Sequence, residues 1–196
     1  MRNTHDTEIE LTLIRHGKTK GNLEKRYIGV TDEPLLEEEK NRLEKIAYEV
    51  PELLFVSSKK RAKETAKILF PGVEMVSLPE LDEMNFGDFE GKNYLDLKDN
   101  EVYQQYIDSN GRTAFPGGES MEDFANRIEG AFNRVMEQAL EDAAKKVTVV
   151  AHGGTIMAIL WKKLGGDYFS YYVGNGECLQ VQVRFAEGKE TWNIIS

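Results

Sequence analysis

The apolar residues of this chain fall into short runs, separated by stretches in which apolar residues recur at helical spacing. Such short runs are typical of strands buried in a sheet. The run VTVVAH at 147–152 is unbroken, as expected for a central strand that is buried on both faces. The predicted strands lie at 9–15, 53–57, 73–78, 147–152, 178–185 and 190–195.

Helical spacing is clearest after Ser120, where an apolar stripe extends over 121–140. Acidic residues crowd the start of this stretch, Lys145-Lys146 stand at its end, and Ser120 with Asp123 resembles a capping box. Other helices are predicted at 35–50, from Ser58 as the cap to Pro71, and at 154–164, with one or two short helices and a glycine-rich loop in 93–118.

This alternation of strands and helices favours an α/β fold with a mostly parallel central sheet and helices on both faces. No linker, repeat or low-complexity segment interrupts the pattern, and 196 residues suit one domain with a sizeable core. We therefore expect a single domain over 1–196, in which residues 1–7 form a flexible tail.

Composition and charge narrow the classes of function. The net charge is −9 and no block rich in lysine and arginine stands out, so we expect no nucleic acid partner. No apolar run approaches the roughly 18 residues that a membrane span needs, and the polar N-terminus does not resemble a secretory signal. The single cysteine, Cys178, cannot form an internal disulfide, which fits a reducing compartment. We expect a cytoplasmic protein with no membrane partner.

Basic side chains stand at the carboxyl ends of three predicted strands. Arg15-His16 follows the first strand, Ser57 with Arg61 follows the second, and His152 ends the central one. Ligands of open α/β sheets bind beyond the carboxyl ends of the strands, so these residues can meet at one edge. Two imidazoles and two guanidiniums around one cavity would form an anion site, since arginine matches phosphoryl oxygens bidentately. A neutral histidine nitrogen is a competent nucleophile at phosphorus, and the leaving oxygen then needs an acid, for which Glu83 is a candidate.

Segments along most of the chain carry a family resemblance. They are Arg15-His16-Gly17-Lys18-Thr19 with Asn22, Tyr27-Ile28-Gly29 with Asp32-Glu33-Pro34-Leu35, Ser57-Ser58-Lys59-Lys60-Arg61-Ala62, Leu81-Asp82-Glu83 with Phe86-Gly87-Asp88-Phe89-Glu90-Gly91, Pro116-Gly117-Gly118-Glu119-Ser120, and Val150-Ala151-His152-Gly153-Gly154. Each segment alone is a weak signal. Together and in this order, they resemble the histidine phosphatase superfamily, the phosphoglycerate-mutase-like proteins.

The resemblance implies a three-layer phosphoglycerate-mutase-like fold and a role for each matching residue. It implies that His16 is the nucleophile that becomes phosphorylated, and that Glu83 protonates the leaving oxygen and later takes a proton from water. It also implies that Arg15, Arg61 and His152 bind the phosphoryl oxygens and neutralise their charge, so that no metal or other cofactor is required. Secondary contacts to substrate or phosphate are implied for Gly17, Thr19, Asn22, Gly29 and Gly153.

Lys18 and Asp82 are among the residues that depart from the family pattern. Lys18 stands where glutamate or glutamine is more usual, and we expect it to alter the pocket rim without abolishing catalysis. Asp82 stands where a basic or polar residue is often found, and its carboxylate could disturb the titration of Glu83.

The spacing within the chain favours a phosphatase over a mutase. Phosphoglycerate mutases that need a bisphosphate cofactor resemble this core but carry longer insertions, with basic residues for a second phosphate. Here Glu83 and His152 are 69 residues apart, and the arginines between them, Arg112 and Arg127 among them, lie in a region rich in acids.

The short length, the loop at 27–35 and the turn at 174–177 most resemble the α-ribazole phosphatases of cobalamin biosynthesis. We predict a metal-independent hydrolase of a small phosphorylated metabolite, with α-ribazole 5′-phosphate as the first candidate. The alternatives are a broad-specificity sugar or metabolite phosphatase, a mutase, a phosphoprotein phosphatase and a non-catalytic phosphate-binding or protein-interaction member. We expect a monomer or a homodimer.

Overall fold

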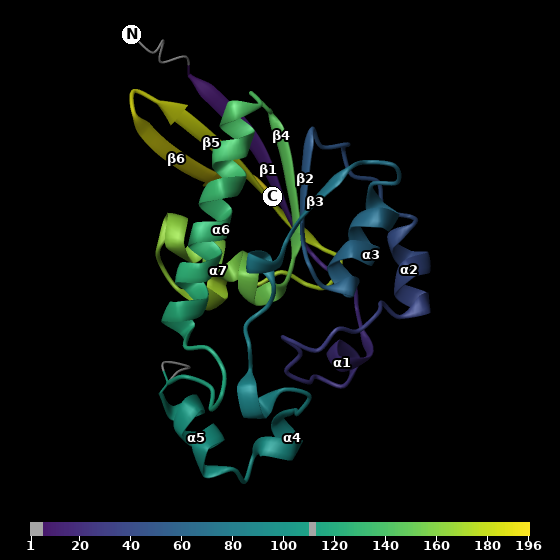
Figure 1. Ribbon diagram of the computed structural model, residues 1–196, viewed down its shortest axis with the longest axis vertical. Helices are drawn as coiled ribbons and strands as arrows, with labels where there is room; N and C mark the ends of the chain where they lie inside the picture. The colour runs from purple at the N-terminus through teal and green to yellow at the C-terminus, as the bar shows by residue number, and fades with distance from the viewer. Residues whose placement is uncertain (1–5, 110–112) are drawn as a thin grey trace.

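The computed structural model describes residues 6–109 and 113–196, which contain one six-stranded sheet (Figure 1). The strands lie side by side in the order β3-β2-β4-β1-β5-β6. Their bounds are Thr7–Arg15 for β1, Leu53–Ser57 for β2, Met75–Leu78 for β3, Lys146–Ala151 for β4, Cys178–Ala186 for β5 and Lys189–Ile194 for β6.

Four neighbouring strands, β3, β2, β4 and β1, are parallel, whereas β5 and β6 continue the sheet in antiparallel fashion. Arg15 at the end of β1 is in register with Ala151 at the end of β4. The parallel strands therefore end at one edge of the sheet, and the residues that end or follow them there include Ser57, His16 and His152.

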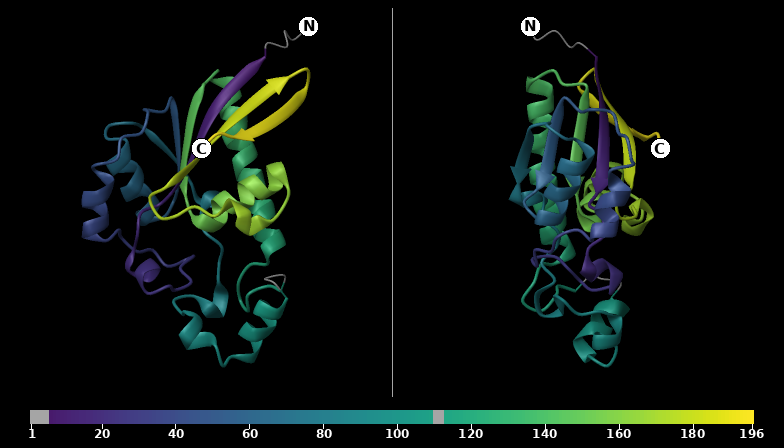
Figure 2. Two further views of the ribbon diagram at one scale, coloured as in Figure 1. Left: turned by 180° about the vertical axis from the view of Figure 1, so that it is seen from behind. Right: turned by 90° about the vertical axis from the view of Figure 1, so that its right-hand side faces the viewer.

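Helices cover both faces of this sheet, as Figures 1 and 2 show. The helices α2 and α3 lie on one face, and α6 and α7 lie on the other. The bounds are Lys20–Leu23 for α1, Glu37–Leu43 for α2, Lys60–Leu69 for α3, Tyr94–Leu97 for α4, Glu101–Asp108 for α5, Met121–Glu141 for α6 and Gly153–Leu164 for α7. Short 3₁₀ helices span Pro79–Leu81, Gly87–Phe89 and Tyr168–Tyr171.

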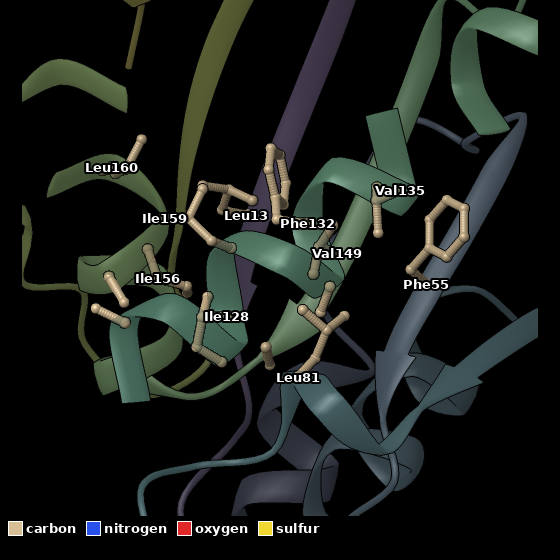
Figure 3. Packing of buried hydrophobic residues seen from close by; sticks show 14 of the residues in the cluster. Leu13, Phe55, Leu81, Ile128, Phe132, Val135, Val149, Ile156, Ile159 and Leu160 are labelled. Carbon is tan, nitrogen blue, oxygen red and sulfur yellow. The ribbon is translucent and has the colours of Figure 1, made fainter. Parts of the chain in front are cut away.

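The alternation of side chains along the strands explains the two layers. Leu13, Phe55 and Val149 belong to the larger apolar cluster, which they form with side chains of α6 and α7 such as Phe132 and Ile159 (Figure 3). The next residues along the same strands, Ile14, Val56 and Val150, belong to a second cluster with Leu43 of α2 and with Ala62 and Ala66 of α3. The unbroken apolar strands are thus buried on both faces, and the predicted α/β fold is confirmed.

The predicted helix at 35–50 is too long. The helix α2 ends at Leu43, after which the amides of Lys45 and Ile46 donate to carbonyls only three residues back. This tightened turn ends the helix, and the chain continues to β2 without regular structure while Ile46 still packs against the smaller cluster. Apolar spacing alone did not reveal this end.

Two other predicted helix ends are wrong. Ser58 does not cap α3, because its hydroxyl donates to Asp82, and Lys59 occupies the cap position without a side-chain bond. The helix α6 does begin after Ser120, whose hydroxyl accepts from the Asp123 amide, but it ends at Glu141. Ala143, with a φ of 53°, turns the backbone out of the helix, and Lys146 already belongs to β4.

The first strand begins earlier than expected. Thr7, which we assigned to a flexible tail over 1–7, is the first residue of β1 and pairs with Phe185 of β5. Asp6 of that predicted tail forms an ion pair with Arg184, whereas residues 1–5 lie outside the described residues, and so does Arg112. Among the described helices, none is both long enough and apolar enough to cross a membrane.

Candidate active site

His16 lies immediately beyond β1, where its amide donates to the carbonyl of Ala151 at the end of β4 (2.9 Å). The imidazole is buried, and Nδ1 lies 2.7 Å from the carbonyl oxygen of Gly17. A carbonyl only accepts, so Nδ1 carries the proton and Nε2 keeps its lone pair. Desolvation, with the charges of Arg61 and Arg15, holds the pKa of His16 well below its usual value. His16 is therefore a neutral imidazole whose Nε2 can act as a nucleophile.

The two predicted arginines are held by backbone carbonyls. Arg15 donates from Nη1 to Val173 (2.9 Å), and its guanidinium lies 5.4 Å from the ring centre of Tyr172. Arg61 is buried on α3 and donates to the carbonyls of Thr31 (2.7 Å), Ile28 and Gly29. In both side chains Nε is buried and has no partner among the described residues.

His152 is buried at the N-terminal cap of α7, and its ring centre lies 5.1 Å from that of His16. Its Nε2 lies 2.7 Å from the hydroxyl of Ser57, whereas Nδ1 is buried without a partner in the described part of the chain. Desolvation is the main cause that lowers the pKa of His152 well below its usual value, and the charge of Arg61 adds to it.

Three buried nitrogens near His16, Nε of Arg15, Nε of Arg61 and Nδ1 of His152, thus lack partners among residues 6–109 and 113–196. The two arginine Nε–H groups are donors, and a buried donor without an acceptor costs about 1–3 kcal/mol, so this arrangement is favourable only if an acceptor binds there. The N-terminus of the twelve-residue helix α7 lies at the same place and adds a field that favours an anion. The donors and this field fit a tetrahedral oxyanion such as a phosphoryl group.

Glu83 lies against Gly154 in the first turn of α7. Its Oε2 accepts from the amide of Gly154 and its Oε1 accepts from the amide of Met84, both at 3.0 Å. A Cβ atom at position 154 would overlap with Oε1, so the carboxyl can come this close only because residue 154 is glycine. Desolvation raises the pKa of Glu83, against the opposing effect of the two amide bonds and of Arg61 and Arg15. A raised pKa suits a carboxylic acid that donates a proton.

The predicted secondary residues surround this centre. The amide of Gly17 donates to the hydroxyl of Thr65, and its carbonyl accepts from Nδ1 of His16, so Gly17 holds the imidazole in place. Thr19 caps α1 and pairs with Asn22, whose Oδ1 also accepts from Asn175.

Gly29 and Gly153 each lie next to one of the two arginines. The carbonyl of Gly29 accepts from Arg61, and Gly153 begins α7 beside Arg15. The roles of all ten predicted residues in catalysis and substrate binding stay predictions, although the structure gathers His16, Arg15, Arg61, His152 and Glu83 at one edge of the sheet.

A cavity of about 230 Å³ opens beside Arg15 and Glu83. Arg15 is the only basic side chain among its described lining residues, and the lining is otherwise mainly aromatic and thioether. It comprises Arg15, Tyr27, Glu83, Met84, Phe86, Tyr106, Met121, Gly153, Gly154, Met157, Tyr168, Phe169 and Tyr172. The sequence analysis missed this cavity, although the aromatic run in YFSYY at 168–172 gave a signal for it.

Arg127, to which the sequence assigned no role in the site, supports the segment that carries Glu83. It forms an ion pair with Glu119 and donates to the carbonyls of Glu80 and Asp82, so it fixes residues 80–83. Lys18 is exposed and does not line the described cavity. Within residues 6–109 and 113–196, no three His, Cys, Asp or Glu side chains are grouped as a metal ion would need.

Comparison with known proteins places this geometry in a family. The chain is 36% identical over 165 residues to 2,3-bisphosphoglycerate-dependent phosphoglycerate mutase 2 of Gloeobacter violaceus, an alignment that covers 76% of this chain and 73% of the relative. It is 32% identical over 190 residues to the uncharacterized phosphatase PhoE of Bacillus subtilis, covering 93% and 90% of the two chains. The crystal structure of the α-ribazole phosphatase from Shigella flexneri superposes with a TM-score of 0.79 at 26% identity, over 95% of this chain and 96% of that one.

The family model of the histidine phosphatase superfamily, branch 1, matches residues 11–193, nearly the whole chain. The match includes every residue that the structure gathers around His16. The chain therefore belongs to the histidine phosphatase superfamily.

Proposed function

We propose that this protein is a phosphomonoesterase that transfers the phosphoryl group of its substrate to Nε2 of His16. The observation that carries the proposal is the neutral imidazole of His16, with its lone pair on Nε2, beside buried nitrogens of Arg15, Arg61 and His152 that have no partner in the described part of the chain. Arginine N–H groups directed at phosphoryl oxygens stabilise the charge that develops in transfer, which is the main catalytic requirement of this chemistry.

The reaction proceeds in two steps. In the first, Nε2 of His16 forms a bond to phosphorus, the bond from phosphorus to the ester oxygen breaks, and that oxygen takes the proton of Glu83. In the second, a water molecule gives a proton to the Glu83 carboxylate while its oxygen attacks phosphorus. The N–P bond then breaks and returns its electron pair to His16. The protein's own cations neutralise the phosphoryl charge, so we expect no metal requirement.

We propose α-ribazole 5′-phosphate as the substrate, on the support of the similar α-ribazole phosphatase and of the aromatic cavity. Phe169 and Tyr172 line that cavity although 61% and 65% of their surfaces are exposed, an unusual position for large apolar groups. Such a lining suits an uncharged aromatic leaving group, since rings stack on rings. A sugar or metabolite phosphatase of broad specificity is the second candidate.

Mutase chemistry on phosphoglycerate is less well supported, although one relative carries a mutase name. A second phosphate or a carboxylate needs cationic partners. Arg127 is engaged by Glu119 and by backbone carbonyls, and Arg15 is the one basic side chain among the described residues that line the cavity. A cytoplasmic location and a monomeric or homodimeric state also stay predictions.

Phosphate release tests the proposal, with EDTA present and with four classes of substrate: α-ribazole 5′-phosphate, 3-phosphoglycerate, sugar phosphates and p-nitrophenyl phosphate. We expect turnover that prefers α-ribazole 5′-phosphate, and an acid-labile phosphoenzyme that His16→Ala abolishes. Broad, slow turnover would keep the histidine chemistry and favour the second candidate. Absence of turnover and of phosphoenzyme on all four classes would contradict the proposed activity.

A further inference from the structure

Asp82 precedes Glu83 in the sequence, but its carboxylate is engaged by the start of α3. Oδ1 accepts from the hydroxyl of Ser57 and from the amide of Ser58, both at 2.7 Å. Oδ2 accepts from the hydroxyl of Ser58 at 2.6 Å and lies 3.7 Å from Nζ of Lys59. The family-atypical carboxylate is thus part of a fixed network, and Ser57 connects this network to His152.

The direction of each hydrogen bond follows from the donors available. A carboxylate only accepts, so the single hydroxyl proton of Ser57 is donated to Asp82. The oxygen of Ser57 then accepts from the Lys59 amide (3.2 Å) and from Nε2 of His152 (2.7 Å). Nε2 must therefore carry the proton, and Nδ1 of a neutral His152 is a bare lone pair.

If the protein binds a phosphoryl group as proposed above, this tautomer determines how Nδ1 of His152 can contact it. The oxygens of a phosphate dianion only accept, so they cannot bond to an unprotonated nitrogen. Nδ1 is buried without a described protein partner. Favourable contact with a phosphoryl oxygen there requires that His152 gains a proton on Nδ1 and becomes an imidazolium, with Nε2 still bonded to Ser57.

The positive charges around His152 disfavour that proton in the free protein, and a bound anion reduces this effect in the complex. Arg61 and Lys59 face the ring from the α3 segment, and Arg15 and His16 face it from the end of β1. An anion among these groups offsets their repulsion. Asp82 is the acidic group connected to the ring in this network, through one hydroxyl.

We propose that Asp82, acting through Ser57, holds His152 in the Nε2–H tautomer and thereby couples the binding of the substrate's phosphate dianion to the uptake of one proton on Nδ1 of His152. Asp82 and Ser57 are positioning residues. Asp82 and the proposed acid Glu83 can stand next to each other because their carboxyl groups have different hydrogen-bond partners and different roles.

Nitrogen-15 NMR of the imidazoles tests the tautomer directly. The chain has three histidines, and His16→Ala identifies the signals of His16. In the free protein we expect Nδ1–H for His16 and Nε2–H for His152. In Asp82→Ala the Ser57 hydroxyl loses its acceptor and can donate to Nε2, so the proton of His152 moves to Nδ1. Glu83→Gln is the matched control, because it changes the adjacent carboxyl without touching Ser57, and the tautomer should not change.

Sulfate tests the proton uptake, because it remains a dianion above about pH 3 and brings no proton of its own. Calorimetry in buffers of different ionisation enthalpy should give one proton taken up per sulfate bound, and the affinity should fall about tenfold per pH unit above the pKa of His152. The uptake should persist in Glu83→Gln and His16→Ala and be lost in Asp82→Ala. In Asp82→Asn, whose amide oxygen can still accept from Ser57, uptake should persist with weaker binding.

The outcomes separate this inference from the proposed function. A resting Nδ1–H tautomer of His152, or a tautomer and proton uptake that Asp82→Ala leaves unchanged, would overturn the role of Asp82. Uptake that disappears in Glu83→Gln or His16→Ala would assign the proton to those residues. If Asp82→Ala does not fold, Ser57→Ala gives the same test, because it removes the oxygen that fixes Nε2. A protein that binds neither sulfate nor inorganic phosphate would contradict the anion site itself.

Discussion

Single atoms decide the chemistry of this site. The bond from Nδ1 of His16 to Gly17 leaves Nε2 with the lone pair that the proposed nucleophile needs, and two amide bonds orient Glu83 towards the start of α7. Replacing one of these atoms should therefore alter one step of the reaction and leave the fold intact.

Glu83→Gln removes the proposed proton donor while keeping the size of the side chain. We expect kcat/KM to fall by about 10²-fold or more for an alkyl phosphate, whose alkoxide leaves poorly without a proton. For p-nitrophenyl phosphate the loss should be at least roughly tenfold smaller, because its leaving group is already stable. The kcat/KM values of both esters measure this, since they report steps up to phosphoenzyme formation. Equal losses would show that Glu83 is not the acid.

Gly154→Ala tests the close approach of Glu83 to α7. The added Cβ overlaps with Oε1 of Glu83, so the carboxyl must move and lose its bond from the residue 154 amide. We expect a loss of about 10²-fold in kcat/KM for alkyl esters, comparable with the loss of the acid itself. Gly130→Ala in α6 is the control, because nothing lies near its Cβ and alanine favours a helix by roughly 1 kcal/mol. Unchanged activity in Gly154→Ala would mean that the acid does not depend on this geometry.

At the scale of elements, the loop after α1 positions Arg61. Oε1 of Glu90 accepts from the amides of Gly29 (2.8 Å) and Thr31 (2.9 Å), while the carbonyls of the same two residues accept from Arg61. The carboxylate of Glu90 therefore holds the loop, and the loop in turn holds the guanidinium of Arg61 on α3.

Glu90→Ala should release this loop and misplace Arg61. We expect kcat/KM to fall by roughly tenfold for every phosphate ester, which equals a loss of about 1.4 kcal/mol. Glu90→Gln keeps an acceptor for the two amides and should retain most of the activity. The assay compares one aromatic ester with one alkyl ester. A loss confined to one of them would indicate a role in the leaving-group site and contradict a role through Arg61.

The whole molecule shows what a sequence can and cannot predict. The strands buried on both faces and the stripe of α6 follow from periodicity, because burial imposes it, and the ends of the predicted strands placed His16, Arg61 and His152 at one edge. The end of α2 at Leu43 depends on a local turn that has no apolar signature. The partner of Ser58, the aromatic cavity and the network of Asp82 join residues far apart in the chain. Such contacts depend on tertiary structure, so a sequence pattern such as the aromatic run at 168–172 can signal a cluster but does not specify which distant residues complete it.

The buried histidines should also make the stability of the whole molecule depend on pH. The pKa values of His16 and His152 are both lowered in the folded protein, mainly by desolvation. The unfolded chain therefore binds more protons than the folded one as the pH falls below the unfolded value of about 6.5. The stabilising contribution is fully present above that value and is lost as the pH falls towards the folded pKa values.

Each histidine should cost up to about 1.4 kcal/mol per pH unit well below pH 6.5, so we expect these two groups to lower the free energy of unfolding by up to roughly 2 kcal/mol between about pH 6.5 and 5.5. Thermal melts over this range measure the fall. It should be about halved in His16→Ala, which removes one of the two groups. Sulfate should reduce it further at low pH, because a bound anion favours protonated His152. A melting temperature that is flat across this window, or a slope that His16→Ala leaves unchanged, would show that these imidazoles are not held neutral by the fold.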